Sequence, residues 1–268
     1  GPGTTPLRYA DADAWKVRDV LVELGGFSSD AVRVLPGVGR AELLAALAEV
    51  GRRARSLTAS GDAVLLLVFY SGHADRDGLL LGRQRLSYVE LTEIVEQSGA
   101  QVQLQIVDAC YAGSLTRPKG ATPVPSFLVD VEDTLAAQGR VVITSSAEDE
   151  YSQESDRIGA SFFTHYMVTG LRGAADTDSD QLVTLDELYR YLYQETLFHT
   201  AGTRAGPQHP AYSFDLSGQG MLVLADLPAA SASLVFPADQ RGRYAVLDRP
   251  PRTFLGARAG PRAPVRPP

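Results

Sequence analysis

The only cysteine and one of the four histidines stand in short runs whose residue types suit nucleophilic chemistry. Cys110 lies in Ile-Val-Asp-Ala-Cys-Tyr-Ala-Gly (106–113), and His73 lies in Phe-Tyr-Ser-Gly-His-Ala (69–74). A cysteine thiolate is a nucleophile, and a nearby imidazole can generate it by accepting the thiol proton. If the fold brings the two side chains together, they predict attack on a carbonyl group.

Both runs follow segments of strand length. Residues 64–70 form a continuous apolar run, as a buried parallel strand does, and residues 102–107 form a second strand pattern. Parallel strands end at one edge of a sheet, and sequential strands usually lie side by side, about 5 Å apart. A free cysteine is usually inert packing, and a lone histidine is usually structural. Their joint position at two strand ends, each beside a glycine (Gly72 and Gly113), favours a catalytic pair.

The same strand ends offer a site for an oxyanion. A carbonyl under attack develops negative charge, which hydrogen-bond donors must stabilise. The backbone N–H groups of Ala74 and Cys110 are the natural pair of donors, because each stands at one of the two strand ends.

The rest of the chain alternates between helix and strand patterns. Helical spacing covers residues 11–24, 41–57, 86–95, 162–171 and 185–197, and strand patterns cover 31–35, 64–70, 102–107, 141–144 and 221–224. This alternation predicts an α/β fold with a mostly parallel central β-sheet flanked by helices.

The composition is that of an acidic globular protein. Among 268 residues, 25 basic and 32 acidic side chains give a net charge of −7, and 44% of the residues are hydrophobic. No run approaches the roughly 18 apolar residues of a membrane span, so we expect no membrane contact. An acidic chain is a poor candidate for nucleic-acid binding. One cysteine allows neither an internal disulfide nor a cysteine metal cluster, so we expect a cytoplasmic protein.

The two ends of the chain differ from its body. We interpret residues 1–6, which open Gly-Pro-Gly without a methionine, as a tag remnant or leader. Residues 241–268 hold seven arginines against one aspartate, a net charge of +6, with six prolines. We therefore predict that residues 229–268 are a Pro/Arg-rich tail or a truncated C-terminal module. Strand patterns at 233–236 and 244–247 favour the module.

Taken together, the runs around His73 and Cys110 resemble the caspase/metacaspase peptidase family, and more closely the bacterial caspase-like proteases. The resemblance covers about residues 7–225. It implies a three-layer sandwich in which Cys110 is the nucleophile and His73 the general base and acid, with no cofactor required. It also implies a peptidase domain over residues 7–228, with a large part at 7–113, a linker at 114–139 and a small part at 140–228.

One element of that family has no clear counterpart here. The family has a strand ahead of the helix that begins near Asp11. Residues 1–10 are short and rich in proline and glycine, so we expect this strand to be missing, degenerate or supplied by another chain.

The resemblance also implies a protein or peptide substrate that is cleaved after Arg or Lys. Asp108 has the place of the glutamine in the animal-caspase motif Gln-Ala-Cys-x-Gly, which is the metacaspase form. Asp13, with Asp11 as the fallback, matches a second pocket carboxylate, and Ser71 matches a polar pocket residue. A carboxylate pair suits a guanidinium group. The alternative for Asp13 is an ordinary acidic residue at a helix N-terminus.

A second acidic segment, residues 145–150, follows the strand pattern at 141–144. In the family the corresponding loop lines the substrate cleft, so Glu148 or Asp149 could contact the basic side chain. Solvation of an ordinary surface loop is the other interpretation.

The linker contains candidate processing positions. Arg117 and Lys119 lie in a stretch rich in turn formers, where the family carries its processing linker. We expect cleavage at Lys119-Gly120, by the enzyme itself or by an upstream activating protease, because proline follows Arg117. A regulatory protein is a further expected partner.

A late acidic segment has the spacing of an EF-hand loop. Asp176, Asp178, Asp180 and Glu187 occupy loop positions 1, 3, 5 and 12. Gln181 replaces the usual glycine at position 6, which weakens the pattern, and an acidic turn before a helix is the alternative. Calcium is therefore the one metal ion that the sequence suggests. Two rival functions remain at this level: a catalytically silent caspase-like scaffold, and a calcium-responsive binding module.

Overall fold

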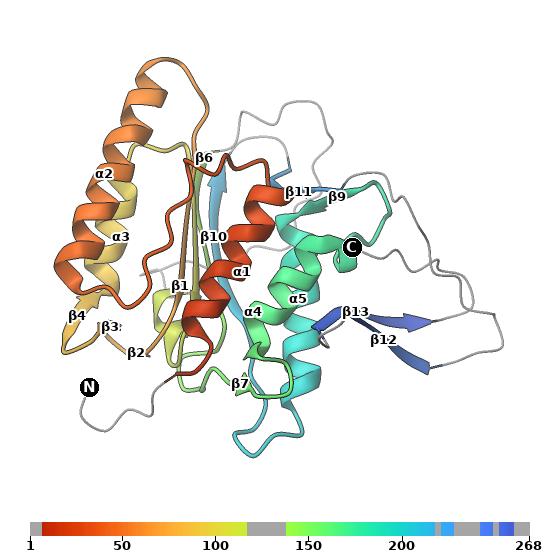
Figure 1. Cartoon of the computed structure of the whole chain (residues 1–268). Helices are drawn as coiled ribbons and strands as arrows, with labels where there is room; N and C mark the ends of the chain where they lie inside the picture. Colours follow the sequence, from red (N-terminus) through yellow and green to blue (C-terminus); the bar gives the residue numbers. More distant parts are fainter. Residues whose placement is uncertain (1–6, 117–137, 218–220, 228–241, 249–251, 260–268) are drawn as a thin grey trace.

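The central element of the fold is a four-stranded sheet. The computed structural model describes residues 7–116, 138–217, 221–227, 242–248 and 252–259. The strands are β1 (Leu65–Ser71), β5 (Val102–Asp108), β6 (Gln138–Thr144) and β10 (Ala211–Ser217), in the spatial order β1-β5-β6-β10. The first three run parallel, and β10 runs antiparallel to β6. The predicted mostly parallel α/β sheet is therefore confirmed (Figure 1).

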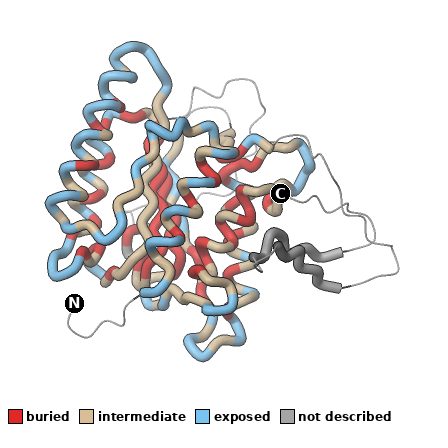
Figure 2. The backbone as a smooth tube through the Cα atoms, viewed as in Figure 1, coloured by how far each residue is buried: buried red, intermediate tan, exposed pale blue. Residues whose placement is uncertain are grey.

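Helices cover both faces of this sheet. On one face lie α2 (Arg40–Ala59) and α3 (Tyr88–Glu96), and on the other lie α1 (Ala10–Glu23), α4 (Phe162–Thr169) and α5 (Leu185–Thr200). Alternate residues of β5 serve the two cores: Leu104 and Ile106 pack toward α1, α4 and α5, and Val107 packs toward α2 and α3. Figure 2 shows this buried material between the layers. In the part of the chain that the structure describes, no helix is long and apolar enough to cross a membrane.

Strand β1 lies at one edge of the sheet, although its sequence is that of an interior strand. In the described part of the chain no strand pairs with its outer side. A groove of about 610 Å³ follows this edge, between aliphatic side chains of α1, α2 and β1 and the segment 31–38. The predicted strand at residues 31–35 is wrong: this segment lines the groove, and in the part of the chain that the structure describes it pairs with no strand.

A small antiparallel sheet follows β1 directly and was not predicted. It consists of β2 (Ala74–Asp75), β3 (Gly78–Leu81) and β4 (Gln84–Ser87). Leu86 and Ser87, predicted as helical, belong to β4. Helix α3 starts at Tyr88 because the Ser87 side chain caps it by accepting a hydrogen bond from Glu90 N at 3.1 Å.

The later part of the chain completes the second layer. Short strands β7 (Glu154–Ser155) and β8 (Ala160–Ser161) precede α4, which ends at Thr169 and continues as the π-helical turn Gly170–Ala174. The strand predicted at 221–224 forms as β11 (Val223–Asp226), but it pairs with β9 (Leu182–Thr184) outside the central sheet. Strand β10 was not predicted.

The C-terminal segment contains a hairpin of β12 (Gly242–Asp248) and β13 (Arg252–Ala259). The strand predicted at 244–247 lies within β12, whereas β13 was not predicted. The pattern at 233–236, the leader 1–6 and the processing positions Arg117 and Lys119 lie outside the described residues.

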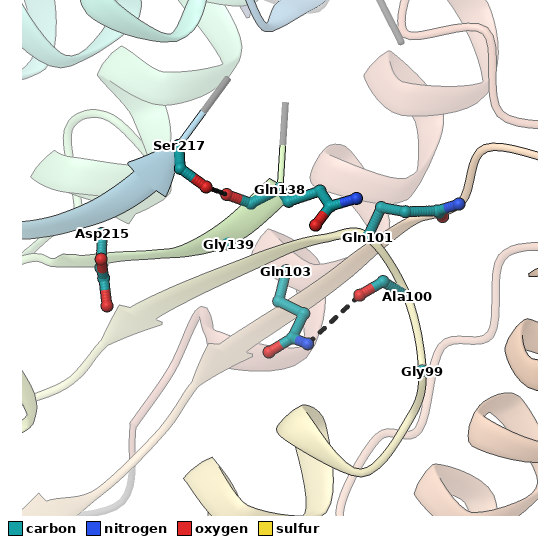
Figure 3. Close-up of a pocket in the computed structure, with 8 residues that line it drawn as sticks. All are labelled: Gly99, Ala100, Gln101, Gln103, Gln138, Gly139, Asp215 and Ser217. Atoms are coloured by element: carbon teal, nitrogen blue, oxygen red, sulfur yellow. Dashed lines mark hydrogen bonds between the residues drawn. The ribbon is translucent and has the colours of Figure 1, made fainter. Parts of the chain in front are cut away.

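At the end of the sheet opposite the carboxyl ends of β1 and β5 lies a shallow polar pocket of about 450 Å³ (Figure 3). Gln103 of β5 borders it, and its amide nitrogen donates to Ala100 O at 3.3 Å. Gln105, two residues further along β5, is fully buried, and neither of its amide atoms has a hydrogen-bond partner among the described residues. Burial of an unpaired amide destabilises the folded state.

Replacing Gln105 with methionine should therefore stabilise the protein. The Gln105→Met side chain has a similar shape and no unpaired polar atoms, and we expect the free energy of unfolding to rise by about 1–2 kcal/mol. Urea denaturation of the two proteins measures this difference. The matched Gln103→Met variant should gain less, because it loses the bond to Ala100 O. A lower urea midpoint for Gln105→Met would show that the amide is satisfied in solution.

Candidate active site

The register of β1 and β5 brings His73 and Cys110 to the same edge of the sheet. Ser71 pairs with Asp108 as the last residue pair of the ladder, and Gly72 N donates to Asp108 O at 3.1 Å. His73 and Cys110 each follow this pair by two residues. The expected adjacency of the two strands is confirmed, and it places the cysteine and the histidine at neighbouring strand ends.

The surroundings of Cys110 favour its thiol form over the thiolate. Its Sγ lies 3.8 Å from Ser152 O, and the side chain is half-buried. Burial raises the pKa of the Cys110 thiol, and the negative charge of Asp108 raises it further. Because the thiolate is the reactive form, a base must remove the proton before this sulfur can attack.

The backbone turns sharply directly after Cys110. Tyr111 has a φ of 59°, in the left-handed region that residues with a Cβ seldom adopt. Its N–H donates to Glu150 O at 3.0 Å. The Glu150 carboxylate in turn accepts His209 N at 2.7 Å and contacts His209 Nδ1 at 2.6 Å. Glu150 and His209, which the sequence analysis did not single out, therefore fix the turn after Cys110 against the segment before β10.

Peptide geometry directs the two candidate oxyanion donors. His73 O accepts hydrogen bonds from Leu80 N at 2.8 Å and from Tyr70 Oη at 2.7 Å. In a trans peptide the C=O and the next N–H point in opposite directions, so Ala74 N–H points away from β3. Ala109 O likewise accepts from the hydroxyl groups of Ser145 and Ser146, at 3.4 and 3.1 Å.

The peptide group before Cys110 follows the same rule as the one before Ala74. Because Ala109 O is held by side chains that follow β6, Cys110 N–H points away from that strand. Both predicted donors are thus directed away from the neighbours that hold their carbonyl groups, as an oxyanion site requires.

Asp108 is a buried carboxylate surrounded by hydroxyl groups. Only 3% of the residue is exposed. One carboxylate oxygen accepts from Ser152 Oγ at 2.6 Å, and the other accepts from Ser161 Oγ and from Thr164 Oγ1, the latter at 2.7 Å. These neutral donors satisfy the carboxylate without cancelling its charge.

Asp13 lies beside Asp108, in the first turn of α1. It is fully buried, with Oδ1 bound by Lys16 Nζ at 3.0 Å and Oδ2 bound by Ser161 N at 2.9 Å. Burial raises the pKa of Asp13 to about 6, and Asp108 adds to the rise, whereas Ser161 and Lys16 oppose it. Ser161 contacts both carboxylates and so joins them into one acidic pair. Asp11, the fallback, is exposed.

The other predicted pocket residues have different positions. Ser71 is half-buried and stands opposite Asp108 in the β-ladder. A Cβ added to Gly113 would lie 2.4 Å from Glu148 N, so the Glu148 backbone is packed against the segment that follows Cys110. Asp149 is exposed and forms an ion pair with Arg76 at 2.6 Å. The structure groups Ser71, Asp13 and Asp108, and it leaves Asp149 at the surface.

Four residues of this network were missed from the sequence: Lys16, Ser152, Ser161 and Thr164. Ser161 is the N-cap of α4, where its Oγ accepts from Thr164 N at 2.9 Å. A serine directly before an apolar helical run indicates an N-cap, so this role of Ser161 could have been predicted. It contained no sign that the same hydroxyl group contacts Asp108, 53 positions earlier.

The predicted calcium loop brings three of its four carboxylates together. Oxygen atoms of Asp176, Asp178 and Glu187 lie within 4.8 Å of one another, and Asp180 is not part of this group. Asp180 Oδ1 accepts from Leu182 N at 2.8 Å. Gln181 has a φ of 73°, so the turn forms without the usual glycine.

Several groups of the loop already serve its own backbone. Glu187 accepts from Thr177 and Thr184 through both carboxylate oxygens, and Thr184 and Glu187 form the capping box of α5. Asp176 accepts from Ser179 N at 2.7 Å. The donor set of hard oxygen atoms fits calcium in type. Calcium binding at this loop stays a prediction.

The raised pKa of Asp13 predicts a specific pH dependence of stability. The folded protein holds the Asp13 proton more tightly than the unfolded chain, so the stability associated with protonated Asp13 is present below the unfolded pKa and is lost as the pH rises through about 6. The melting temperature of wild type relative to Asp13→Asn should therefore fall between about pH 4 and pH 6.

Differential scanning calorimetry of both proteins across this range measures the effect. Burial lowers the pKa of His165 to about 4, which acts in the opposite direction, but His165 is present in both proteins and cancels in the difference. A difference in melting temperature that stays constant from pH 4 to pH 7 would contradict the assignment.

Comparison with known proteins agrees with this architecture. A sequence model of the caspase domain family matches residues 1–219. No curated protein matches the chain. Among solved structures, Caspase-1 from Spodoptera frugiperda is similar, with a TM-score of 0.56 and 16% identity over 83% of this chain and 84% of that chain. The structure of pro-sf-caspase-1 gives a TM-score of 0.55 and 16% identity over the same shares.

At this identity the structural likeness establishes a shared fold. The match of the sequence model extends over most of the chain and includes both strand ends with His73 and Cys110. The chain therefore belongs to the caspase domain family of peptidases.

Proposed function

We propose that this protein is a cysteine endopeptidase that cleaves proteins after Arg or Lys. The observation that carries the proposal is the acidic pair of Asp13 and Asp108, which are buried together. Asp108 stands two residues before Cys110, at the end of β5. A fold that buries two carboxylates at this edge favours a cationic side chain there, because a cation offsets their mutual repulsion.

In the proposed reaction, His73 accepts the proton of Cys110 as the sulfur attacks the scissile carbonyl carbon. The N–H groups of Ala74 and Cys110 stabilise the oxyanion. His73 then donates the proton to the leaving amine, and the C–N bond breaks to give an acyl-enzyme. A water molecule, deprotonated by His73, attacks the thioester, and release of the acid restores the thiol. The chemistry requires no metal ion or cofactor.

The P1 side chain, which precedes the cleaved bond, is proposed to enter beside Asp108. A guanidinium offers a planar fork of donors that matches a carboxylate, and Ser71 adds a polar group in register with it. Glu148 and Asp149 would lie on the rim. The Asp149–Arg76 ion pair joins the loop after β6 to the turn after β2, so a substrate that used Asp149 would have to replace Arg76.

Hydrolysis of matched peptides tests the proposal. Fluorogenic peptides with Arg, citrulline or Asp at P1 compare a cation, its neutral isostere and an anion in one sequence. We expect turnover for Arg and a loss of roughly a hundredfold or more in kcat/KM for citrulline, since Asp108, whose donors are all neutral, would then have no cation beside it. Cys110→Ala and His73→Ala should remove activity and keep the fold by circular dichroism.

The outcomes separate the parts of the proposal. No turnover of any peptide by freshly purified protein would contradict a peptidase and favour the silent scaffold, which the protonated Cys110 thiol also suits. Preference for the Asp peptide would contradict only the proposed role of Asp13 and Asp108, and the peptidase activity would stand. Calcium belongs in the same assay: a response that Asp178→Ala abolishes would support a regulatory loop, and calcium binding without turnover would support the binding module.

We further propose that residues 7–228 form the peptidase domain, with residues 229–268 as a separate tail or module, and that cleavage at Lys119-Gly120 separates the large and small parts. A cytoplasmic setting suits the single free thiol of the protein.

If processing is required, the Lys119→Ala protein should remain intact and lose most of its activity, because the linker then stays uncut. Intact-mass analysis and peptide assays measure both effects. Arg117→Ala is the matched control, and full activity of an uncut Lys119→Ala protein would contradict processing.

A further inference from the structure

The acidic pair already has a cation of its own. Lys16 Nζ lies 3.0 Å from Asp13 Oδ1 and 2.7 Å from Gly159 O. The lysine side chain is 38% exposed and the aspartate side chain is fully buried, so the ammonium group reaches the carboxylate from the protein surface. Lys16 stands three residues after Asp13 on α1, which is the spacing of neighbours on one helix face.

This contact differs from a surface ion pair because Asp13 is linked through Ser161 to Asp108. Ser161 N donates to Asp13, and Ser161 Oγ donates to Asp108. Among the described residues that hydrogen-bond these two carboxylates, Lys16 alone has a formal positive charge. The local balance is thus two carboxylates against one ammonium group, which leaves one negative charge for a substrate cation.

Lys16 and a basic P1 side chain would therefore compete for the same oxygen atoms. Both oxygens of Asp13 have donors and the residue is fully buried, so a substrate cation that approaches Oδ1 meets Lys16 there. A partly exposed lysine can rotate into water on its flexible stem. An incoming lysine would exchange one ammonium group for another, whereas a guanidinium brings additional, fork-shaped donors.

We propose that Lys16 is a specificity-determining residue that competes with the P1 cation for Asp13 and thereby makes the enzyme select Arg over Lys. The inference rests on the proposed function, since it names the selectivity of that same site. It assigns the discrimination between the two basic residues to an internal competitor instead of to the shape of the pocket.

Binding and turnover of paired peptides test the inference. In the Cys110→Ala background, calorimetry measures the affinity of uncut peptides with Arg or Lys at P1, and the catalytic protein supplies kcat and KM. Lys16→Met should lower KM and Kd for the Lys peptide by roughly tenfold, because the competing cation on Asp13 is removed. The values for the Arg peptide should fall less, and kcat should stay unchanged.

Two controls separate competition from support of the fold. Lys16→Arg keeps the competing cation and should not gain affinity for the Lys peptide. Asp13→Asn/Lys16→Met should bind like Asp13→Asn alone, because the contested carboxylate is gone. Lys16→Gln, with an uncharged polar side chain, serves as the second variant if methionine lowers the melting temperature.

The pH dependence of peptide binding is a further test, because it would not change if Lys16 only supported the fold. Asp13 is faced by Lys16 from α1 and by Asp108 from β5, and Lys16 is also near His165 of α4. Because Lys16 lowers the pKa of Asp13, the gain in Lys16→Met should appear only at higher pH than the wild-type transition.

Each outcome has a distinct meaning. An unchanged Arg-to-Lys ratio in a folded Lys16→Met protein, a raised KM, or a gain that persists without Asp13 would overturn the inference. If the Cys110→Ala protein binds the peptides with the expected shifts but the wild type cleaves neither, the proposed peptidase activity fails and the competition stands. If no form binds a basic peptide, both fail.

Discussion

The burial of Asp108 is the constraint on which the rest of the site depends. A carboxylate that is 3% exposed must be supplied with donors by the protein, and its donors come from Ser152, Ser161 and Thr164. These residues bind the end of β5 to the loop after β6 and to the first turn of α4. The strand end that carries Cys110 is thereby fixed to the second half of the chain by hydrogen bonds at sequence separations of 44 to 56. Removal of one donor would leave a buried charge with fewer partners, so the network has little tolerance for change.

The elements that position His73 and Cys110 could be predicted from the sequence because they are encoded locally. The apolar run before His73 and the strand pattern before Cys110 determine two strands, and the rule for sequential parallel strands makes them neighbours. The segment 31–35 has an equally good pattern and forms no strand. A strand needs a partner for its backbone groups, and among the described residues no strand pairs with this segment. Pattern alone cannot report whether the partner is present.

The two buried carboxylates were named from the sequence, but the contacts that hold them are long-range. Asp13 and Asp108 could be named from motifs, but the serine and threonine hydroxyl groups that hold them are ordinary polar residues in sequence. Asp149 shows the reverse: its place in an acidic segment predicts contact with a cation, and the cation that it meets is Arg76, 73 positions earlier. An acidic residue signals charge locally, whereas the three-dimensional fold decides which charge it meets.

Under the proposed function, the charge of Asp108 would connect substrate recognition with the reactivity of Cys110. Its negative charge raises the pKa of Cys110, on top of the effect of burial, so the isolated site favours the thiol over the reactive thiolate. Lys16 offsets charge at Asp13, which lies one serine away, while the donors at Asp108 itself are neutral. Under the proposed function, a P1 cation beside Asp108 would oppose the same field that holds the thiol protonated. The carboxylate that would select the substrate would then also favour the unreactive thiol form of Cys110 until a cationic P1 side chain binds.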